Sequence, residues 1–123
     1  MKIHQSSEDY LETILMINEE KGFCRCVDIA EHLHFKKSSV TLAVNKLEDE
    51  HLVVKQRGHI TLTEEGLKRA RLILNRHRFF HSWLKALGIE DPVAEEEACN
   101  MEHTMSEDTF QKIKAFVEKY IEL

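Results

Sequence analysis

The chain of 123 residues lacks a long apolar run and a secretory signal. No stretch approaches the roughly 20 apolar residues that a membrane-spanning helix needs. It also lacks an even set of cysteines, and three cysteines without an export signal favour a reducing cytoplasm over a disulfide framework. Repeats, low-complexity runs and long linkers are missing too. We therefore expect a cytoplasmic protein without membrane contacts, formed by one domain or by a small domain with a compact extension.

A basic net charge, which is common in DNA-binding proteins, is also missing, because the formal net charge is −5. The acidity is unevenly distributed. Residues 1–78 carry 13 Lys and Arg against 12 Asp and Glu, a net charge of +1, whereas residues 79–123 carry 4 against 10, a net charge of −6. A near-neutral N-terminal part can still present a basic face, so the charge leaves DNA binding open.

The acidic C-terminal part contains metal-ligand types of residue at helical spacing. Four of them follow one another at steps of four, three and one: Glu95, Cys99, Glu102 and His103. On an α-helix this spacing gathers all four on one face, on a helix that restarts the chain at Asp91-Pro92. Carboxylates, a thiol and an imidazole form a ligand set for a first-row transition metal. Burying such a face is expensive unless its charges are paired or bind a cation.

The stretch after Cys26 predicts a helix-turn-helix. A short helix over 27–33 and a tight turn at His34-Phe35 precede a second helix that begins near Ser38. The exposed face of the second helix and the residues before it carry small, amide and basic groups, together with one leucine. Small, amide and basic groups suit the phosphates and base edges of a major groove. These residues are Lys36, Lys37, Ser38, Ser39, Thr41, Leu42, Asn45 and Lys46.

Two β-prone runs follow, over 52–56 and 59–63. They enclose an Arg57-Gly58 turn and predict a hairpin, which is the wing of a winged helix. Lys55 and Arg57 lie near its tip, where a wing can contact phosphate or a minor groove. We therefore include both in the expected DNA-binding surface. A winged helix used only for protein contacts is the alternative, since fold alone does not settle function.

Further helices flank this module. Ser6-Ser7 followed by acidic residues predicts a helix start, and Lys21-Gly22 predicts its end. A long helix is predicted over 64–87, before Gly88. The last helix follows Ser106 and has an apolar face wider than its neighbours can cover. We interpret this face as a dimer interface.

Two pairs of ligand-type residues lie on the flanking helices. Asp9 and Glu12 are three residues apart on the first helix, and His77 and His81 are four apart on the long helix, so each pair shares a face. Each pair alone has an ordinary explanation, as solvated first-turn acids or as half-buried histidines. The winged helix and the Glu95–His103 stretch in the same chain favour the interpretation that both pairs are metal ligands.

These observations predict a mainly α-helical chain with one small β-hairpin. We expect residues 1–63 to form a winged helix-turn-helix DNA-binding domain. Residues 64–123 are expected to form a helical metal-binding and dimerisation domain, with residues 64–87 as its long linking helix.

The sequence resembles the DtxR/MntR family of metal-dependent transcriptional repressors, the group of the diphtheria-toxin repressor and the manganese-transport regulator. The resemblance runs from Ser7 to Tyr120. It rests on Glu8-Asp9-Tyr10-Leu11-Glu12, Val27-Asp28-Ile29-Ala30, Ser38-Ser39-Val40-Thr41, Leu62-Thr63-Glu64-Glu65-Gly66, Arg76-His77-Arg78, and Glu97-Ala98-Cys99 followed by Glu102-His103-Thr104-Met105-Ser106. It implies a protein that is not an enzyme. The expected protein dimerises through its C-terminal helices and binds a double-stranded DNA operator when a divalent metal is bound.

The resemblance also implies the ligands of the main metal site, which are Asp9, Glu12, His77, Cys99, Glu102 and His103. Cys99 falls where iron-type members have Cys and the shorter manganese regulators have Glu. His81 and Glu95 fall where iron-type members place a Glu and a His of an ancillary site, with the two residue types exchanged. The resemblance therefore implies a second site formed by His77, His81 and Glu95.

The donor types bear on the choice of metal. Carboxylate oxygens favour Mn(II), whereas the Cys99 thiolate favours Fe(II), Zn(II) or Co(II). We predict Mn(II) or Fe(II) as the effector in the cell, with Zn(II) or Co(II) binding in vitro. Leu42 departs from the family, since iron-type repressors have a base-reading Gln there, so the operator sequence cannot be transferred. The chain ends at Leu123, which predicts the short form without the SH3-like domain of some family members.

Two other functions stay open. Cys24, Cys26 and Cys99 offer a thiol-redox switch, although Cys26 lies at an apolar helix position and is expected in the core. A winged-helix sensor of an organic ligand that needs no metal is the second possibility, but the charged Glu95–His103 stretch argues against it. A di-iron carboxylate enzyme would need repeated Glu-x-x-His pairs from several helices, and the sequence has none.

Overall fold

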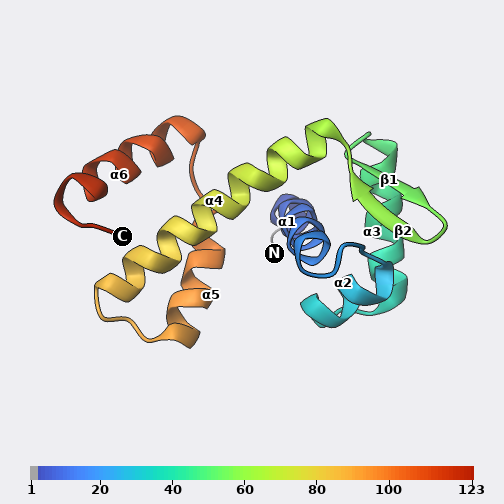
Figure 1. The fold of residues 1–123 in the computed structure, drawn as a ribbon, viewed down its shortest axis with the longest axis horizontal. Helices are drawn as coiled ribbons and strands as arrows, with labels where there is room; N and C mark the ends of the chain where they lie inside the picture. The colour runs from blue at the N-terminus through green and yellow to red at the C-terminus, as the bar shows by residue number, and fades with distance from the viewer. Residues whose placement is uncertain (1–2) are drawn as a thin grey trace. The chain divides into compact units, whose positions relative to one another are not determined.

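The computed structural model describes residues 3–123, which form six helices and a two-stranded sheet (Figure 1). In chain order the elements are α1 (Ile3–Lys21), α2 (Cys26–Leu33), α3 (Lys37–Asp49), β1 (Val53–Gln56), β2 (His59–Leu62), α4 (Glu64–Ala86), α5 (Asp91–Met101) and α6 (Glu107–Tyr120). The predicted fold class, mainly helical with one hairpin, is confirmed. Among the described residues, none of the helices is long and apolar enough to cross a bilayer.

The chain divides into two compact units, one up to Arg71 and one from Leu72 to Leu123. The division falls inside α4, which begins in the N-terminal unit and ends in the C-terminal unit. The predicted domain boundary at residue 63 stays a prediction.

The N-terminal unit has an aliphatic core. The helix α1 packs against α2, α3 and β2, and α3 packs against β1. The buried side chains come from every one of these elements and include Leu11, Ile14, Ile29, Val40, Val44, Leu47, Val53 and Ile60. On α3 the buried residues recur at steps of four and three, so the opposite face of that helix is left for solvent.

The first helix begins earlier than the sequence predicted. It starts at Ile3, so Ser6-Ser7 does not cap it and lies inside the helix. The residues upstream contain neither Gly nor Pro. A serine in a helix interior lowers helix stability by only about 0.5 kcal/mol relative to alanine. The predicted end is confirmed, because α1 stops at Lys21 and Gly22 has a positive φ of 81°.

A buried carboxylate fixes the start of α2. The Asp28 side chain is 3% exposed and accepts hydrogen bonds from the Arg25 backbone N–H (2.9 Å) and the Lys21 Nζ (3.0 Å). The Arg25 Nε lies 3.4 Å from the same carboxylate. The helix ends at Leu33, and the left-handed backbone of the next residue, His34 (φ 60°), turns the chain toward α3. This is the tight turn that the sequence predicted for the helix-turn-helix.

The wing is an antiparallel hairpin in which Val53 pairs with Leu62 and Gln56 with His59. Its two turn residues, Arg57 (φ 54°) and Gly58 (φ 81°), both adopt positive φ values. Such a two-residue turn matches the right-handed twist of paired strands. The predicted hairpin and its Arg57-Gly58 turn are confirmed.

Thr63, directly before α4, is hydrogen-bonded to the segment that precedes β1 and to the first turn of α4. Thr63 donates its N–H to the Leu52 carbonyl (3.0 Å), and its hydroxyl donates to the His51 carbonyl (2.8 Å) while accepting from the Gly66 N–H (3.1 Å). A Cβ at Gly66 would collide with the Leu52 carbonyl oxygen. Glycine is therefore required here for the close approach of two backbone segments.

The C-terminal unit packs around aromatic residues. Figure 1 shows α5 and α6 along opposite sides of the C-terminal half of α4. The rings of Phe79 and Phe80 on α4 meet the ring of Phe110 on α6, each at a centroid distance of 5.7 Å. Ala94 and Ala98 bring α5 into the same cluster. The small alanine side chains let α5 approach α4 closely, which matters for the polar residues between these helices.

Candidate metal centre and nucleic-acid surface

The centre of the C-terminal unit is a buried carboxylate in contact with two imidazoles. The Glu102 side chain is fully buried, and its Oε1 lies 2.8 Å from His77 Nδ1. Its Oε2 lies 3.3 Å from His103 Nε2, and the His103 side chain is only 2% exposed. A buried carboxylate is costly unless it is paired or binds a cation, and an imidazole carries a charge only when it is protonated. These three side chains therefore form a group suited to a divalent cation.

Glu102 and His103 lie directly after the C-terminal end of α5. The helix ends at Met101, and Glu102 still donates its N–H to the Ala98 carbonyl (3.1 Å) with a helical backbone. The expectation that four ligand residues share one helix is therefore wrong for His103, which follows the helix in a turn. The Thr104 N–H donates to the Met101 carbonyl (3.2 Å) and closes that turn.

Arg76 holds this turn from α4. Its guanidinium is largely buried and donates to two backbone carbonyls, those of Glu102 (3.1 Å) and Met105 (2.8 Å). It also pairs with the Glu107 carboxylate (3.0 Å) and lies over the Phe110 ring at 5.4 Å. The pKa of Glu107 is lowered, because hydrogen bonds from Gln111 and from Arg76 outweigh the effect of burial. In the sequence, Arg76 stands out only as part of the motif Arg76-His77-Arg78, and this role was not predicted.

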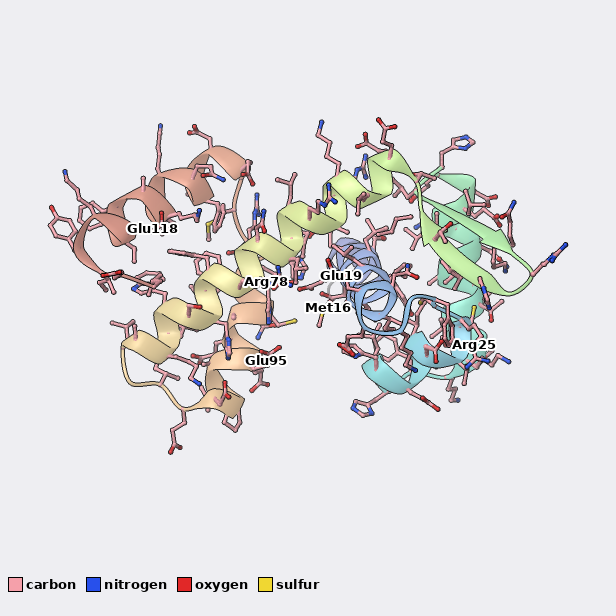
Figure 2. All side chains as sticks on the ribbon, in the orientation of Figure 1. Met16, Glu19, Arg25, Arg78, Glu95 and Glu118 are labelled. Carbon is pink, nitrogen blue, oxygen red and sulfur yellow. The ribbon has the colours of Figure 1, made fainter. Side chains whose placement is uncertain are left out.

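A second group of ligand-type residues lies toward the start of α5. His77 Nε2 is 3.0 Å from the Glu95 Oε2, so the His77 ring contacts carboxylates at both nitrogens. Figure 2 labels Glu95, whose side chain is 59% exposed. His81 stacks on His77 at a centroid distance of 6.1 Å, and its Nε2 is 3.8 Å from Glu95. The structure thus brings His77, His81 and Glu95 near one another, as predicted for the second site.

His81 has a closer partner that the sequence analysis missed. Its Nε2 lies 2.7 Å from the Asp91 Oδ1. Hydrogen bonding from His81, together with the nearby Lys85 ammonium, lowers the pKa of Asp91. Asp91 is four residues before Glu95 on α5, and that spacing could have identified it.

The remaining predicted ligands differ in their surroundings. Cys99 is half-buried on α5, one turn before Glu102. Asp9 and Glu12 lie on α1 in the N-terminal unit, where Asp9 is half-buried and Glu12 is buried. As ligand types, the Glu102 carboxylate, the two imidazoles and the Cys99 thiol of the C-terminal unit are all ones that first-row divalent metals bind. The complete set of six ligands stays a prediction.

The predicted DNA-binding residues form an exposed stripe on and before α3. All of them are exposed except Thr41, which is half-buried and donates its hydroxyl to the Lys37 carbonyl (3.0 Å). On the wing, Arg57 is exposed at the turn and Lys55 is half-buried. Lys55 joins the wing to α3, because its Nζ donates to Asn45 Oδ1 (2.7 Å) and its backbone N–H donates to Glu48 (3.1 Å).

The cysteines bear on the redox alternative. Cys24 is fully buried and Cys26 is half-buried, so the expectation of Cys26 as the core residue is wrong. Cys24 precedes α2 and enters the core from the loop, where its carbonyl accepts from the Ile60 N–H (2.7 Å). Burial, aided by Asp28 and Cys26, raises the pKa of Cys24 to about 12. This thiol stays protonated at neutral pH and is a poor nucleophile.

Comparisons with known proteins cover nearly the whole chain. Residues 2–59 match the family model described as the iron dependent repressor, N-terminal DNA binding domain. Residues 63–121 match the model described as the iron dependent repressor, metal binding and dimerisation domain. The chain is 36% identical to the HTH-type transcriptional regulator MntR of Shouchella clausii over 118 residues. The aligned residues make up 95% of this chain and 82% of that protein.

Solved structures give the same answer. The chain is similar to the T. acidophilum IdeR (33% identity, TM-score 0.75, 89% of this chain) and to the manganese regulator SloR (29% identity, TM-score 0.80, 91% of this chain). It spans about half the length of these two chains, 53% of each. The homologues are transcriptional regulators. The chain therefore belongs to the iron-dependent repressor family, the DtxR/MntR group of metal-dependent transcriptional repressors.

Proposed function

We propose that this chain is a Mn(II)- or Fe(II)-activated repressor that binds operator DNA as a homodimer and controls metal homeostasis. The observation that carries the proposal is the buried Glu102 carboxylate in contact with His77 and His103. Similarity to MntR and to the manganese regulator SloR supports Mn(II), and similarity to IdeR supports Fe(II) as the other candidate.

The proposed main site consists of Asp9, Glu12, His77, Cys99, Glu102 and His103. A bound divalent cation supplies the positive charge that these carboxylates and the thiolate need. To act as ligands, both imidazoles must be neutral and Cys99 must be a thiolate, so metal binding releases protons and weakens as the pH falls. His77, His81 and Glu95 are the proposed second site, where Asp91 already holds His81.

The proposed DNA-binding domain is residues 1–63. The stripe on α3, with Lys55 and Arg57 on the wing, supports it, because basic and small polar groups suit phosphates and base edges. The proposed metal-binding and dimerisation domain is residues 64–123. Its dimer surface is the exposed face of α6, where Phe116 is 64% exposed and Tyr120 is 68% exposed. These rings line an apolar groove of about 620 Å³ that also includes Trp83 and Ile113.

Activation in this proposal is a population shift. Ligands from α1 and from the C-terminal unit favour one arrangement of the two units over others, provided that the metal binds that arrangement more tightly. In a dimer, the favoured arrangement places the two α3 helices about 34 Å apart, one turn of DNA.

The experiment that tests the proposal is a titration of DNA binding with Mn(II), Fe(II), Zn(II) and Co(II) side by side. The DNA is a duplex selected from a random library by the Mn(II)-loaded protein, and binding is followed by fluorescence anisotropy. We expect tight binding only with metal. Equal binding in a chelator would overturn the proposal. A change in the DNA binding of the metal-free protein on treatment with peroxide or diamide would instead support the redox alternative.

Substitutions test the ligand assignment. Cys99→Ala and Glu102→Gln should each abolish the metal dependence of DNA binding while leaving the helical content and the dimer intact. Glu96→Gln is the matched control, because Glu96 is an exposed carboxylate on the same helix α5. Unchanged metal dependence in the Cys99 and Glu102 variants would refute the assignment, and loss in the Glu96 variant would show that the effect is not specific.

A further inference from the structure

The DNA-facing stripe of α3 contains one large apolar side chain. Leu42 is 72% exposed, the highest value among the exposed large hydrophobic residues of the described chain. It lies three residues after Ser39 and three before Asn45, in the middle of a polar face. The buried face of α3 is complete without it, because Val40, Val44 and Leu47 fill that side.

An exposed leucine side chain does not stabilise the fold, because its apolar surface stays in water. It can contribute binding free energy when an apolar group of a partner covers it. Lys46, four residues after Leu42, is exposed on the same helix, as is Lys37 in its first turn. A partner with negative charges and embedded apolar groups fits this surface. In a DNA major groove the only apolar group on the natural bases is the thymine C5 methyl.

Asn45 next to Leu42 is held in a defined orientation. The Lys55 ammonium lies 2.7 Å from the Asn45 Oδ1. An ammonium group can only donate, so this contact identifies the amide end near Lys55 as oxygen. Lys55 is itself anchored, because its backbone N–H donates to the Glu48 carboxylate (3.1 Å). The amide NH₂ group of Asn45 is therefore directed away from Lys55, as a donor.

This orientation changes what Asn45 can read. An asparagine that reads adenine needs its oxygen to accept from the adenine N6 while its nitrogen donates to N7. With the oxygen engaged by Lys55, donation is the favoured mode. The matching groups on base edges are acceptors, namely thymine O4, guanine O6 and purine N7.

We propose that Leu42 and Asn45 specify the operator together: Leu42 contacts a thymine methyl in each half-site, and Asn45, oriented by Lys55, donates to an adjacent base acceptor. The inference rests on the proposed function, because it names the base chemistry that the same DNA-binding surface reads. Thymine suits the pair well, since its methyl and its O4 lie side by side on one base edge.

The first experiment measures the thymine methyl directly. Duplexes selected by the Mn(II)-loaded full chain are resynthesised with deoxyuridine in place of thymidine, one symmetric pair of positions at a time. We expect one pair to weaken binding about fourfold per half-site, the effect of one buried methyl group. Leu42→Ala should bind the thymine and uracil duplexes equally. Leu87→Ala, at another exposed leucine (58%) outside this face, should keep the fourfold difference.

Tolerance of uracil at every position by the unsubstituted protein would overturn the assignment to Leu42. The same conclusion would follow if Leu42→Ala kept the methyl effect. The failure of the proposed function looks different, because the protein would then show no metal-dependent DNA binding with any duplex. Metal-dependent binding without a methyl effect would refute this inference alone.

The second experiment tests the role of Lys55. The variant Lys55→Met frees the Asn45 oxygen, so repeated selection should give a gain of adenine at the position next to the thymine, together with weaker overall binding. Asn45→Ala should lose base preference at that position only. If Lys55→Met selects the same base as the unsubstituted protein, Lys55 does not orient Asn45 and that part of the inference is wrong.

Discussion

Asp28 in the N-terminal unit and Glu102 in the C-terminal unit are both buried carboxylates, but their partners differ. Asp28 is held by the Lys21 ammonium, by the Arg25 guanidinium and by a backbone N–H. The partners of Glu102 include two imidazoles, His77 and His103, which are bases that can also bind metal. The difference separates a structural carboxylate, neutralised by the protein, from one suited to an external cation.

The two units also differ in how deeply they bury their cationic side chains. The N-terminal core is aliphatic, and the cations that pair with Asp28 are half exposed. The C-terminal unit buries the Arg76 guanidinium against Phe110 and the turn that carries Glu102. The C-terminal unit should therefore be more sensitive to the loss of a single buried cation.

The largest expected effect is that of Arg76→Leu. The substitution removes the donors to the Glu102 and Met105 carbonyls and the pair with Glu107, so we expect a loss of about 3 kcal/mol in the free energy of unfolding. Urea unfolding followed by circular dichroism measures it. Arg69→Leu is the control, because Arg69 forms an exposed ion pair with Glu65 on the surface of α4, and we expect this substitution to cost under about 1 kcal/mol. Equal losses would show that burying the Arg76 guanidinium adds no more stability than a surface ion pair.

Metal protection compares the two carboxylates directly. With free Mn(II) at about 100 times its dissociation constant, the folded state should gain about 2.7 kcal/mol. Glu102→Gln should remove this gain, whereas Asp28→Asn should keep it, because only Glu102 is a proposed ligand. Thermal unfolding with and without Mn(II) provides the measurement. Full protection of the Glu102 variant would place the metal elsewhere.

Gly66→Ala tests packing of backbone against backbone in the N-terminal unit. The new Cβ would meet the Leu52 carbonyl, and the two segments must separate, so we expect a loss of about 2 kcal/mol. Lys68→Ala, at an exposed position one residue beyond Leu67 on α4, should be within about 0.5 kcal/mol of the unsubstituted protein. Chemical unfolding gives the free energy of unfolding of both variants. An unchanged value for Gly66→Ala would contradict the close approach of the Gly66 and Leu52 backbones.

The smallest effect concerns pH and Asp28. Burial alone would raise the pKa of this carboxyl, but hydrogen bonds from Lys21 and from Arg25 outweigh it and lower the pKa below its usual value. The stabilisation is therefore present above the unfolded pKa of about 3.9 and is lost as the pH falls through the folded pKa. Because Lys21 and Arg25 are half exposed, we expect only about 1 kcal/mol.

The measurement is the stability of the unsubstituted protein and of Asp28→Asn between pH 7 and pH 2. The difference between them should be constant from pH 7 to pH 5 and should vanish under strongly acidic conditions. A difference that grows as the pH falls would have the wrong sign for a carboxyl with a lowered pKa.

Much of the fold was predictable because its determinants are local. The apolar spacing of α3, the left-handed turn at His34 and the Arg57-Gly58 turn all depend on neighbouring residues. The start of α1 was predicted several residues too far along the chain. A residue suited to N-capping does not force the helix to begin there when the residues before it can also be helical. The end of α5 before His103 was missed for a similar reason, since helical spacing does not show where the helix stops.

The site was predictable in its residue types and less so in its contacts. Helical spacing identified His77 and the Glu102-His103 pair separately, and only the family resemblance joined them in one ligand set. The structure brings these three together. Arg76 was missed because its partners lie on another element and on the turn after α5. Asp91 was missed although it lies four residues before Glu95 on the same helix, a spacing that places both side chains on one face. Cys26 was wrongly expected in the core, and the buried cysteine is Cys24, since a loop residue can enter a core as readily as a helical one.

The sequence by itself determined the order of the elements, the winged helix-turn-helix and the ligand types, because periodicity, capping and turn chemistry are encoded within a few residues of one another. Only the tertiary structure decided which charges are buried and what they contact. The sequence identified Glu102 as a ligand type, but it did not show that Asp28 and Glu102 are both buried. Their surroundings make one structural and the other a candidate ligand, because the cost of a buried charge depends on the groups that surround it.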